Sequence, residues 1–597
     1  MTEQKRYLIT TEDEATWKFD QPVIFLGEWC RLYDCKHIWQ NMDAKVAKPY
    51  GLDATNKDTD DLKIKALGEK LFPEFCKILN QNFHTNYSKR FWQIILGPWF
   101  REILSLLLNR TNTLKQCLAT EEIFGTTLYH SDYCSLTIPN LKASDYFFEN
   151  AKWNNVLNGR ILSLIDNNKI TINFIEDKDS KYFYQPLKTN ISNKNQSFKK
   201  NIKNYIYRSY RKIAEKFVKN EDAYLIKTSL TLKQLIKLQL ALGQCPQLWE
   251  KIEPNIEEKP DQFLRKKLTQ KFLQKSEDDL ENISRILLFE LLPVCYLEGF
   301  KELTKIVNQQ PWPQSPKFIF TCNSYGSDEI FKMYTAIKTE NGSKYYVGQH
   351  GNGYFTDKHF HPRNEEQTAD KFLTWGWSSK IPKYIPMFTF KTAGKLNNYN
   401  NKGGLLLIEK SQYTRHLPWD IHSEFLNYFE DQKKFVSQLS EAPKQKLTIR
   451  LSSSISNIKL NETSRWSDID RSLKIDDGKA AIKNLEAESR LVVHSYDSTG
   501  LLETLSQNIP TLAFWQNGFD HLREEVRPDY QMLVDSGIIH LSVKSVVDKV
   551  NEIWDDVDGW WLQSNVQDSK KIFCDIYAKS CKNPIKTMAS LLIKKDI

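Results

Sequence analysis

The chain has 597 residues, of which 40% are apolar and 26% are charged. A chain of this length exceeds one ordinary hydrophobic core, so we expect at least two domains, and its composition excludes a disordered or fibrous protein. The net charge of +9 is mild for this length. Because no nucleic-acid-binding motif accompanies it, nucleic acid is not an expected partner.

The start of the chain lacks the apolar region of a secretory signal. No apolar run is expected to span a membrane, because the best candidate, residues 286–300, is interrupted by Glu290, Pro293 and Glu298. The ten cysteines lack the paired spacing of a zinc site, and free thiols in a reducing cytosol are expected. The sequence therefore predicts a cytoplasmic protein.

Short apolar runs at residues 7–10 and 23–26 predict the first strands. The second strand is followed by Gly27, Glu28 and Arg31. A glycine, a carboxylate and a guanidinium at a strand end are typical of a ligand-facing loop. Glu28 is a candidate general base, with Gly27 and Arg31 on the acceptor side, and a surface ion pair between Glu28 and Arg31 is the equal alternative.

Residues 62–110 have helical spacing, and the strongly apolar stretch 87–110 contains Gly97 and Pro98, which predict a kink or a break. Trp92 beside the break is a candidate to line an acceptor cleft, and a packed pair of core helices is the alternative. Farther on, the basic run 199–216 predicts either a solvated helix face or a surface for anionic lipid, nucleic acid or glycan. The sequence QQPWPQSP at 309–316 predicts an interdomain linker.

After this point strands and helices alternate, with strands expected at 317–321 and 344–347. The second of these strands ends in GQHGNG, which comprises Gly348, Gln349, His350, Gly351, Asn352 and Gly353. Glycines let a backbone approach a ligand closely, and a histidine there suits proton transfer or a phosphate contact. Strands at 404–408 and 447–451 lie near Arg415 and Arg450, which are candidates either to neutralise a diphosphate or to form surface ion pairs.

Residues 489–514 predict a βαβ unit, with a strand at 491–493, a polar turn, a helix that ends before Pro510, and a strand at 511–514. The turn follows the carboxyl end of a strand, where open α/β sheets bind ligands. It offers the hydroxyls of Ser498 and Thr499 beside a helix N-terminus, which suits a phosphate. Glu503, one helical turn farther, suits a ribose. The alternative is that Ser495, Asp497 or Ser498 only caps the helix.

We therefore predict an α/β protein with two Rossmann-like domains facing a cleft, and with a helical insertion in the N-terminal half. The expected units are an acceptor-side domain at 1–308, the linker at 309–316, a nucleotide-binding domain at 317–545, and a helical tail at 546–597 that packs back across the cleft.

Several stretches carry a resemblance to a known family, namely VIFLGEWCRLY (23–33), KRFWQIILGPW (89–99), YYVGQHGNGY (345–354), FLTWGW (372–377) and residues 492–510. They resemble a family of transferases that are encoded in O-antigen and other surface-polysaccharide gene clusters of bacteria. More remotely, the C-terminal half is similar to GT-B glycosyltransferases that use CMP-activated ulosonic acids. That resemblance implies a phosphate site at His494, Ser498 and Thr499, and a ribose contact at Glu503.

The resemblance implies a glycosyltransferase that moves a sugar from a nucleotide donor, for which a CMP-activated ulosonic acid is one candidate, to a lipid-linked glycan at the inner face of the membrane. No cofactor is expected, and no metal either, because the spacing of Asp58 and Asp60 falls in polar loop sequence. The alternatives are a polyol-phosphate transferase of the teichoic-acid type and a non-catalytic glycan- or nucleotide-binding scaffold. Glu28 and His350 are the candidate bases, and Glu28 and Asp132 are the candidate nucleophiles for a double displacement.

Overall fold

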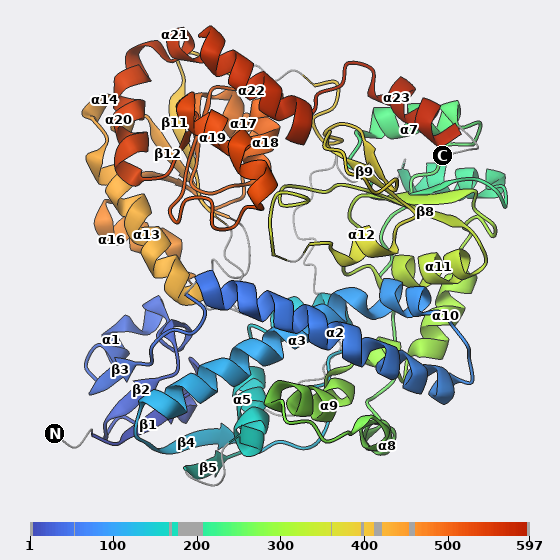
Figure 1. The fold of residues 1–597 in the computed structure, drawn as a ribbon, viewed down its shortest axis with the longest axis vertical. Helices are drawn as coiled ribbons and strands as arrows, with labels where there is room; N and C mark the ends of the chain where they lie inside the picture. Colours follow the sequence, from blue (N-terminus) through green and yellow to red (C-terminus); the bar gives the residue numbers. More distant parts are fainter. Residues whose placement is uncertain are drawn as a thin grey trace.

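The computed structural model describes residues 4–52, 54–165, 170–176, 207–359, 361–395, 399–410, 421–452 and 460–593. Within these residues the strands form three parallel β-sheets, and helices surround each of them (Figure 1). Parallel strands need crossover connections, which helices provide here. The predicted α/β class is therefore confirmed.

The first sheet has the order β3-β2-β1-β4-β5. Its strands are β1 (Arg6–Ile9), β2 (Val23–Phe25), β3 (Ala44–Val46), β4 (Ile123–Tyr129) and β5 (Thr171–Ile175). Two long helices, α2 (Ala54–Phe83) and α3 (Lys89–Thr120), connect β3 to β4 and cross the middle of the molecule between this sheet and the other two (Figure 1). By length and composition alone α3 could cross a membrane, contrary to our expectation, but 72% of its apolar window is buried inside the protein.

The second sheet has the order β10-β9-β8-β7-β6. Its strands are β6 (Tyr224–Leu225), β7 (Phe318–Thr321), β8 (Lys344–Gly348), β9 (Lys371–Thr374) and β10 (Tyr384–Pro386). Because β6 pairs with β7, residues 309–316 connect two strands of one sheet and do not separate two domains. This stretch is also packed, since Trp312 is buried and the Pro313 carbonyl accepts a hydrogen bond from the Tyr334 hydroxyl at 2.7 Å.

The third sheet has the order β13-β12-β11-β14-β15-β16. Its strands are β11 (Gly404–Ile408), β12 (Leu447–Arg450), β13 (Lys474–Asp476), β14 (Ser489–His494), β15 (Thr511–Phe514) and β16 (Ile539–His540). The βαβ unit comprises β14, α18 (Thr499–Ser506) and β15, and the two strands are parallel neighbours. Residues 317–545, which the sequence analysis grouped as one unit, therefore supply strands to two sheets, and the chain passes between them after β10.

The C-terminal helices are α20 (Val543–Ile553), α21 (Val557–Trp561), α22 (Ser564–Tyr577) and α23 (Pro584–Ile593). After α22 the chain returns to the second sheet, where the Lys579 amide donates to the Trp375 carbonyl at 2.8 Å and the Lys579 carbonyl accepts from the Thr389 amide at 2.9 Å. Helix α23 then lies beside α7 (Leu232–Ala241) (Figure 1). The tail thus ties the second and third sheets together.

Candidate functional site

Two loops from different sheets meet at the carboxyl ends of their strands. One loop follows β8 and contains His350, and the other joins β14 to α18. The Asn352 amide donates a hydrogen bond to the Thr499 hydroxyl at 3.0 Å. Gly351 is required for this approach, because a Cβ atom there would lie 2.5 Å from the same hydroxyl. The candidate site is therefore a seam between two α/β lobes, at the strand ends where such sheets bind ligands.

The buried side chain of His494 supports the turn before α18. Ser498 caps the helix by accepting from the Leu501 amide at 2.9 Å, and its hydroxyl lies 3.2 Å from His494 Nδ1. The other ring nitrogen of His494 lies 3.3 Å from the Thr504 hydroxyl. Burial lowers the pKa of His494 to about 3, so the ring is neutral. His494 is fully buried and both of its nitrogens have partners, so it positions Ser498 and is not placed to contact a phosphate as expected.

Positive charge gathers at the seam around His350. The imidazole is exposed and makes no hydrogen bond with a described residue. The pKa of His350 is lowered because the protein that surrounds the ring disfavours its charged form, and the charges of Lys391 and Arg363 add to this effect. Near neutral pH the ring is therefore an uncharged base. The amides of Thr499 and Gly500 at the start of α18 donate to no described residue, and together with Lys391 and Arg363 they provide positive charge and donors that suit an anion.

Glu503 lies one turn into α18. Its Oε2 atom accepts from Lys391 Nζ at 2.9 Å. Its Oε1 atom is buried and accepts no hydrogen bond from a described residue. The ribose contact expected at Glu503 stays a prediction.

Asp497 links the loop after β8 to the segment after β15, and sequence reasoning did not single it out as a site residue. Its carboxylate accepts from Asn352 Nδ2 at 2.6 Å, His521 Nε2 at 3.0 Å and the Tyr530 hydroxyl at 3.1 Å. Burial disfavours the charge on His521, but the hydrogen bond and charge of Asp497 outweigh it and raise the pKa of His521. Asp497 therefore fastens the β8 loop to the third sheet.

The backbone reinforces this junction. The Lys358 amide donates to the His521 carbonyl, and the Arg523 amide donates to the Thr356 carbonyl, each at 3.0 Å. Because these bonds span the two lobes, the segment after β15 belongs to the site. Its only signal in the sequence was a histidine between charged residues, DHLRE at 520–524.

A second feature that the sequence reasoning missed lies at the same edge of the third sheet. Glu409 follows β11 and Glu462 opens α16 (Glu462–Ile469), and both side chains are buried. Glu409 Oε1 accepts from Trp466 Nε1 at 3.2 Å, whereas its Oε2 atom and both oxygens of Glu462 accept no hydrogen bond from a described residue. Burial raises the pKa of Glu462 to about 8, and burial together with the neighbouring Glu462 raises the pKa of Glu409 well above its usual range.

The predicted N-terminal site residues lie elsewhere. Glu28 and Arg31 form the alternative ion pair, with a shortest nitrogen–oxygen distance of 2.6 Å, beside Arg465 of α16. Gly27 makes room for the ring of Trp29, since a Cβ atom would lie 2.1 Å from it. Trp92 is fully buried in the core, where its ring nitrogen donates to Asn80. Glu28, Gly27, Arg31 and Trp92 therefore do not join His350 at the seam.

The remaining predicted residues shape the loops. Gln349 is buried, and its side-chain oxygen accepts from the Trp375 amide at 2.9 Å and from Trp377 Nε1 at 2.8 Å. It therefore supports the loop and does not contact the nucleotide-sugar donor. Gly348 packs against Cys322, and Gly353 has a φ of +84°. Ser495 is buried, and its hydroxyl pairs with Tyr428 at 2.6 Å. Arg415 lies outside the described residues.

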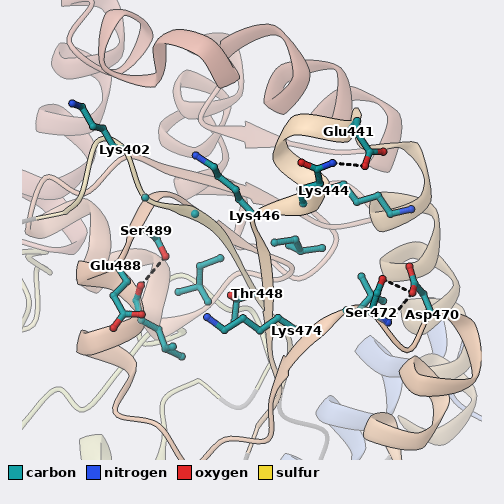
Figure 2. A pocket seen from close by; sticks show the side chains of 17 residues that line it. Lys402, Glu441, Lys444, Lys446, Thr448, Asp470, Ser472, Lys474, Glu488 and Ser489 are labelled. Carbon is teal, nitrogen blue, oxygen red and sulfur yellow. Dashed lines mark hydrogen bonds between the residues drawn. The ribbon is translucent and has the colours of Figure 1, made fainter.

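A cavity lies on the opposite edge of the third sheet (Figure 2). It has a volume of about 700 Å³ and lies at the amino ends of β11, β12, β13 and β14. Lysines line it, namely Lys402, Lys444, Lys446 and Lys474. Because ligands of open α/β sheets bind at the carboxyl ends of the strands, this cavity is not part of the candidate site.

All ten cysteines are free. Among the described residues no group of three or more His, Cys, Asp or Glu side chains is placed to hold a metal ion.

A family model described as "LIC12162 family transferase" matches residues 6–592. No curated protein matches the sequence. Solved structures give remote matches. Acinetobacter baumannii MurG has a TM-score of 0.28 at 11% identity, over 50% of this chain and 77% of that one. The wall teichoic acid polymerase TagF has a TM-score of 0.30 at 9% identity, and the match covers 66% of this chain and 95% of TagF. A UDP-N-acetylglucosamine 2-epimerase from Listeria monocytogenes has a TM-score of 0.37 at 8% identity, and the match covers 63% of this chain and 96% of the epimerase. Scores this low support no inference about function.

Proposed function

Because the chain belongs to the LIC12162 family of transferases, we propose that it transfers a sugar from a nucleotide donor to a lipid-linked glycan in the synthesis of a bacterial surface polysaccharide. The reaction would take place at the cytoplasmic face of the membrane. The observation that carries the proposal is the seam between two α/β lobes, where the loop of His350 meets the amino end of α18 and Lys391 pairs with Glu503 of the same helix.

The donor phosphate would lie at the first turn of α18. Its amides and the hydroxyl of Thr499 face an incoming anion, and the nearby ammonium of Lys391 adds positive charge. The carboxylate of Glu503, one turn farther and beside Lys391, would accept a hydrogen bond from a ribose hydroxyl. Charge and hydrogen-bonding capacity therefore both favour a nucleotide over an uncharged ligand.

His350 is the candidate base for the acceptor hydroxyl. The acceptor oxygen attacks the anomeric carbon, the bond from that carbon to the phosphate oxygen breaks, and the nucleotide leaves with the bonding electrons. His350 takes the proton of the hydroxyl, which it can do because its lowered pKa keeps it neutral at pH 7. We favour His350 over Glu28 as the base, because the carboxylate of Glu28 pairs with Arg31 at 2.6 Å.

A donor panel tests the proposal. Thermal unfolding of the purified protein would be followed with CMP-sugars, UDP-sugars and CDP-polyols separately, and hydrolysis of each donor would be measured. We expect one class to raise the unfolding temperature of the wild type, and to raise that of a Thr499→Val variant by less at the same donor concentration. If no member of the panel raises that temperature or is turned over, the donor assignment fails. Turnover of CDP-polyols alone would identify the polyol-phosphate alternative instead.

A further inference from the structure

The helical segment at residues 207–217 presents apolar side chains to the solvent. Ile213 and Phe217 are each 60% exposed. Their spacing of four residues places them on one side of the helix. Single exposed apolar residues are ordinary on a protein surface, but two on the same side of one helix indicate an interaction surface.

The same segment is strongly basic. Arg208, Lys212, Lys216 and Lys219 are exposed and form no ion pair with a described residue. The one acidic residue inside the segment, Glu215, is only half-exposed. A solvated helix face, the simpler interpretation of this basic run, explains the lysines but not the exposed Ile213 and Phe217.

The segment is held firmly against the protein on its other side. Ala214 is buried, and its carbonyl accepts from Gln247 Nε2 at 2.8 Å. The Tyr210 hydroxyl donates to the Pro246 carbonyl, also at 2.8 Å. Shortly after the segment the chain enters β6, the edge strand of the second sheet. The solvent-facing side of residues 207–217 is therefore a fixed part of the lobe that carries the His350 loop.

We propose that residues 207–219 form a docking surface for an anionic lipid bilayer. Ile213 and Phe217 would enter the boundary between head groups and acyl chains, while the four basic side chains contact lipid phosphates. The proposal deepens the proposed function, because an acceptor linked to lipid lies at a membrane. It does not depend on it, because lipid binding can be measured without donor or acceptor.

Vesicle binding tests the surface directly. The full chain would be sedimented with sucrose-loaded vesicles of phosphatidylcholine alone, and with vesicles that contain phosphatidylglycerol. We expect binding to the anionic vesicles that falls as salt is raised, and little binding to the neutral ones. The variants Ile213→Ser/Phe217→Ser and Lys212→Glu/Lys216→Glu should each lower the partition coefficient about tenfold or more.

Matched variants control for general changes in hydrophobicity and charge. Leu562→Ser/Ile572→Ser removes two side chains that are 61% and 50% exposed elsewhere, and Lys446→Glu/Lys474→Glu reverses two exposed lysines at the cavity of Figure 2. Both controls should bind like the wild type. The proposal is overturned if the wild type does not bind anionic vesicles or if either surface variant binds them as strongly as the wild type. It is also overturned if the control variants lose as much vesicle binding as the surface variants. Failure of donor binding with intact vesicle binding would refute only the transferase proposal.

Discussion

The amide of Asn352 and the hydroxyl of Thr499 lie 3.0 Å apart, although 147 residues separate them in the chain. This bond joins the end of β8 in one sheet to the start of α18 in another. It places the loop of His350 over a helix N-terminus, and the proposed chemistry depends on that placement.

The first prediction concerns this bond. Thr499→Val keeps the shape of the side chain but leaves the Asn352 amide without its acceptor, which costs about 1–3 kcal/mol where the group stays buried. We expect donor affinity, measured by calorimetry, to fall about tenfold, which corresponds to about 1.4 kcal/mol. Thr499→Ser retains the hydroxyl and should bind the donor like the wild type. Equal affinities in Thr499→Val and the wild type would contradict a role for this contact.

The second prediction concerns His350 as the base. His350→Gln should lower kcat about 100-fold or more while leaving donor affinity within a factor of about two. Because the pKa of His350 is lowered, the wild-type rate should fall only below pH 6.5, where the ring becomes protonated. The variant should lose this acidic limb of the kcat profile. A variant that keeps both the rate and the limb would assign the base to another residue.

The third prediction concerns the junction at Asp497. Since Asp497 raises the pKa of His521, their pairing stabilises the protein fully below pH 6.5, and this contribution is lost as pH rises through the raised pKa. Asp497→Asn should destabilise the protein at pH 6 by about 2 kcal/mol, the range of a hydrogen bond to a charged group, and by less at pH 8.5. Denaturant unfolding at the two pH values measures this. His521→Gln is the control, and in its background Asp497→Asn should show no such pH dependence.

The fourth prediction concerns the buried carboxyl group of Glu462. Its pKa is about 8 in the folded protein, against an ordinary value near 4.5, so the folded state holds a proton that the unfolded state has lost. The contribution of this group to the free energy of unfolding should therefore fall as pH rises from about 4.5 to about 8, by up to about 1.4 kcal/mol per pH unit. Glu462→Gln should reduce this slope. The control Glu441→Gln changes an exposed residue and should leave the slope unchanged.

A good part of the site was predictable from local sequence. Apolar runs bounded by Gly and Pro indicated β8, β14 and β15, and the polar turn of the βαβ unit located Ser498, Thr499 and Glu503 at the start of α18. The reason is that strand, turn and helix preferences act over a few residues. The role of His494 was not predictable, because the same residue pattern fits a ligand-facing histidine and a buried one that braces a cap.

Local sequence thus determined the α/β class, the Gly-rich loop around His350 and the hydroxyl-bearing turn before α18. Only the tertiary structure decided that the strands form three sheets, that Glu28 pairs with Arg31 away from the seam, and that Asp497 joins Asn352 to His521. These outcomes depend on contacts between residues that are far apart in the chain. Burial and the pairing of charges depend on such contacts, and no short stretch of sequence records them.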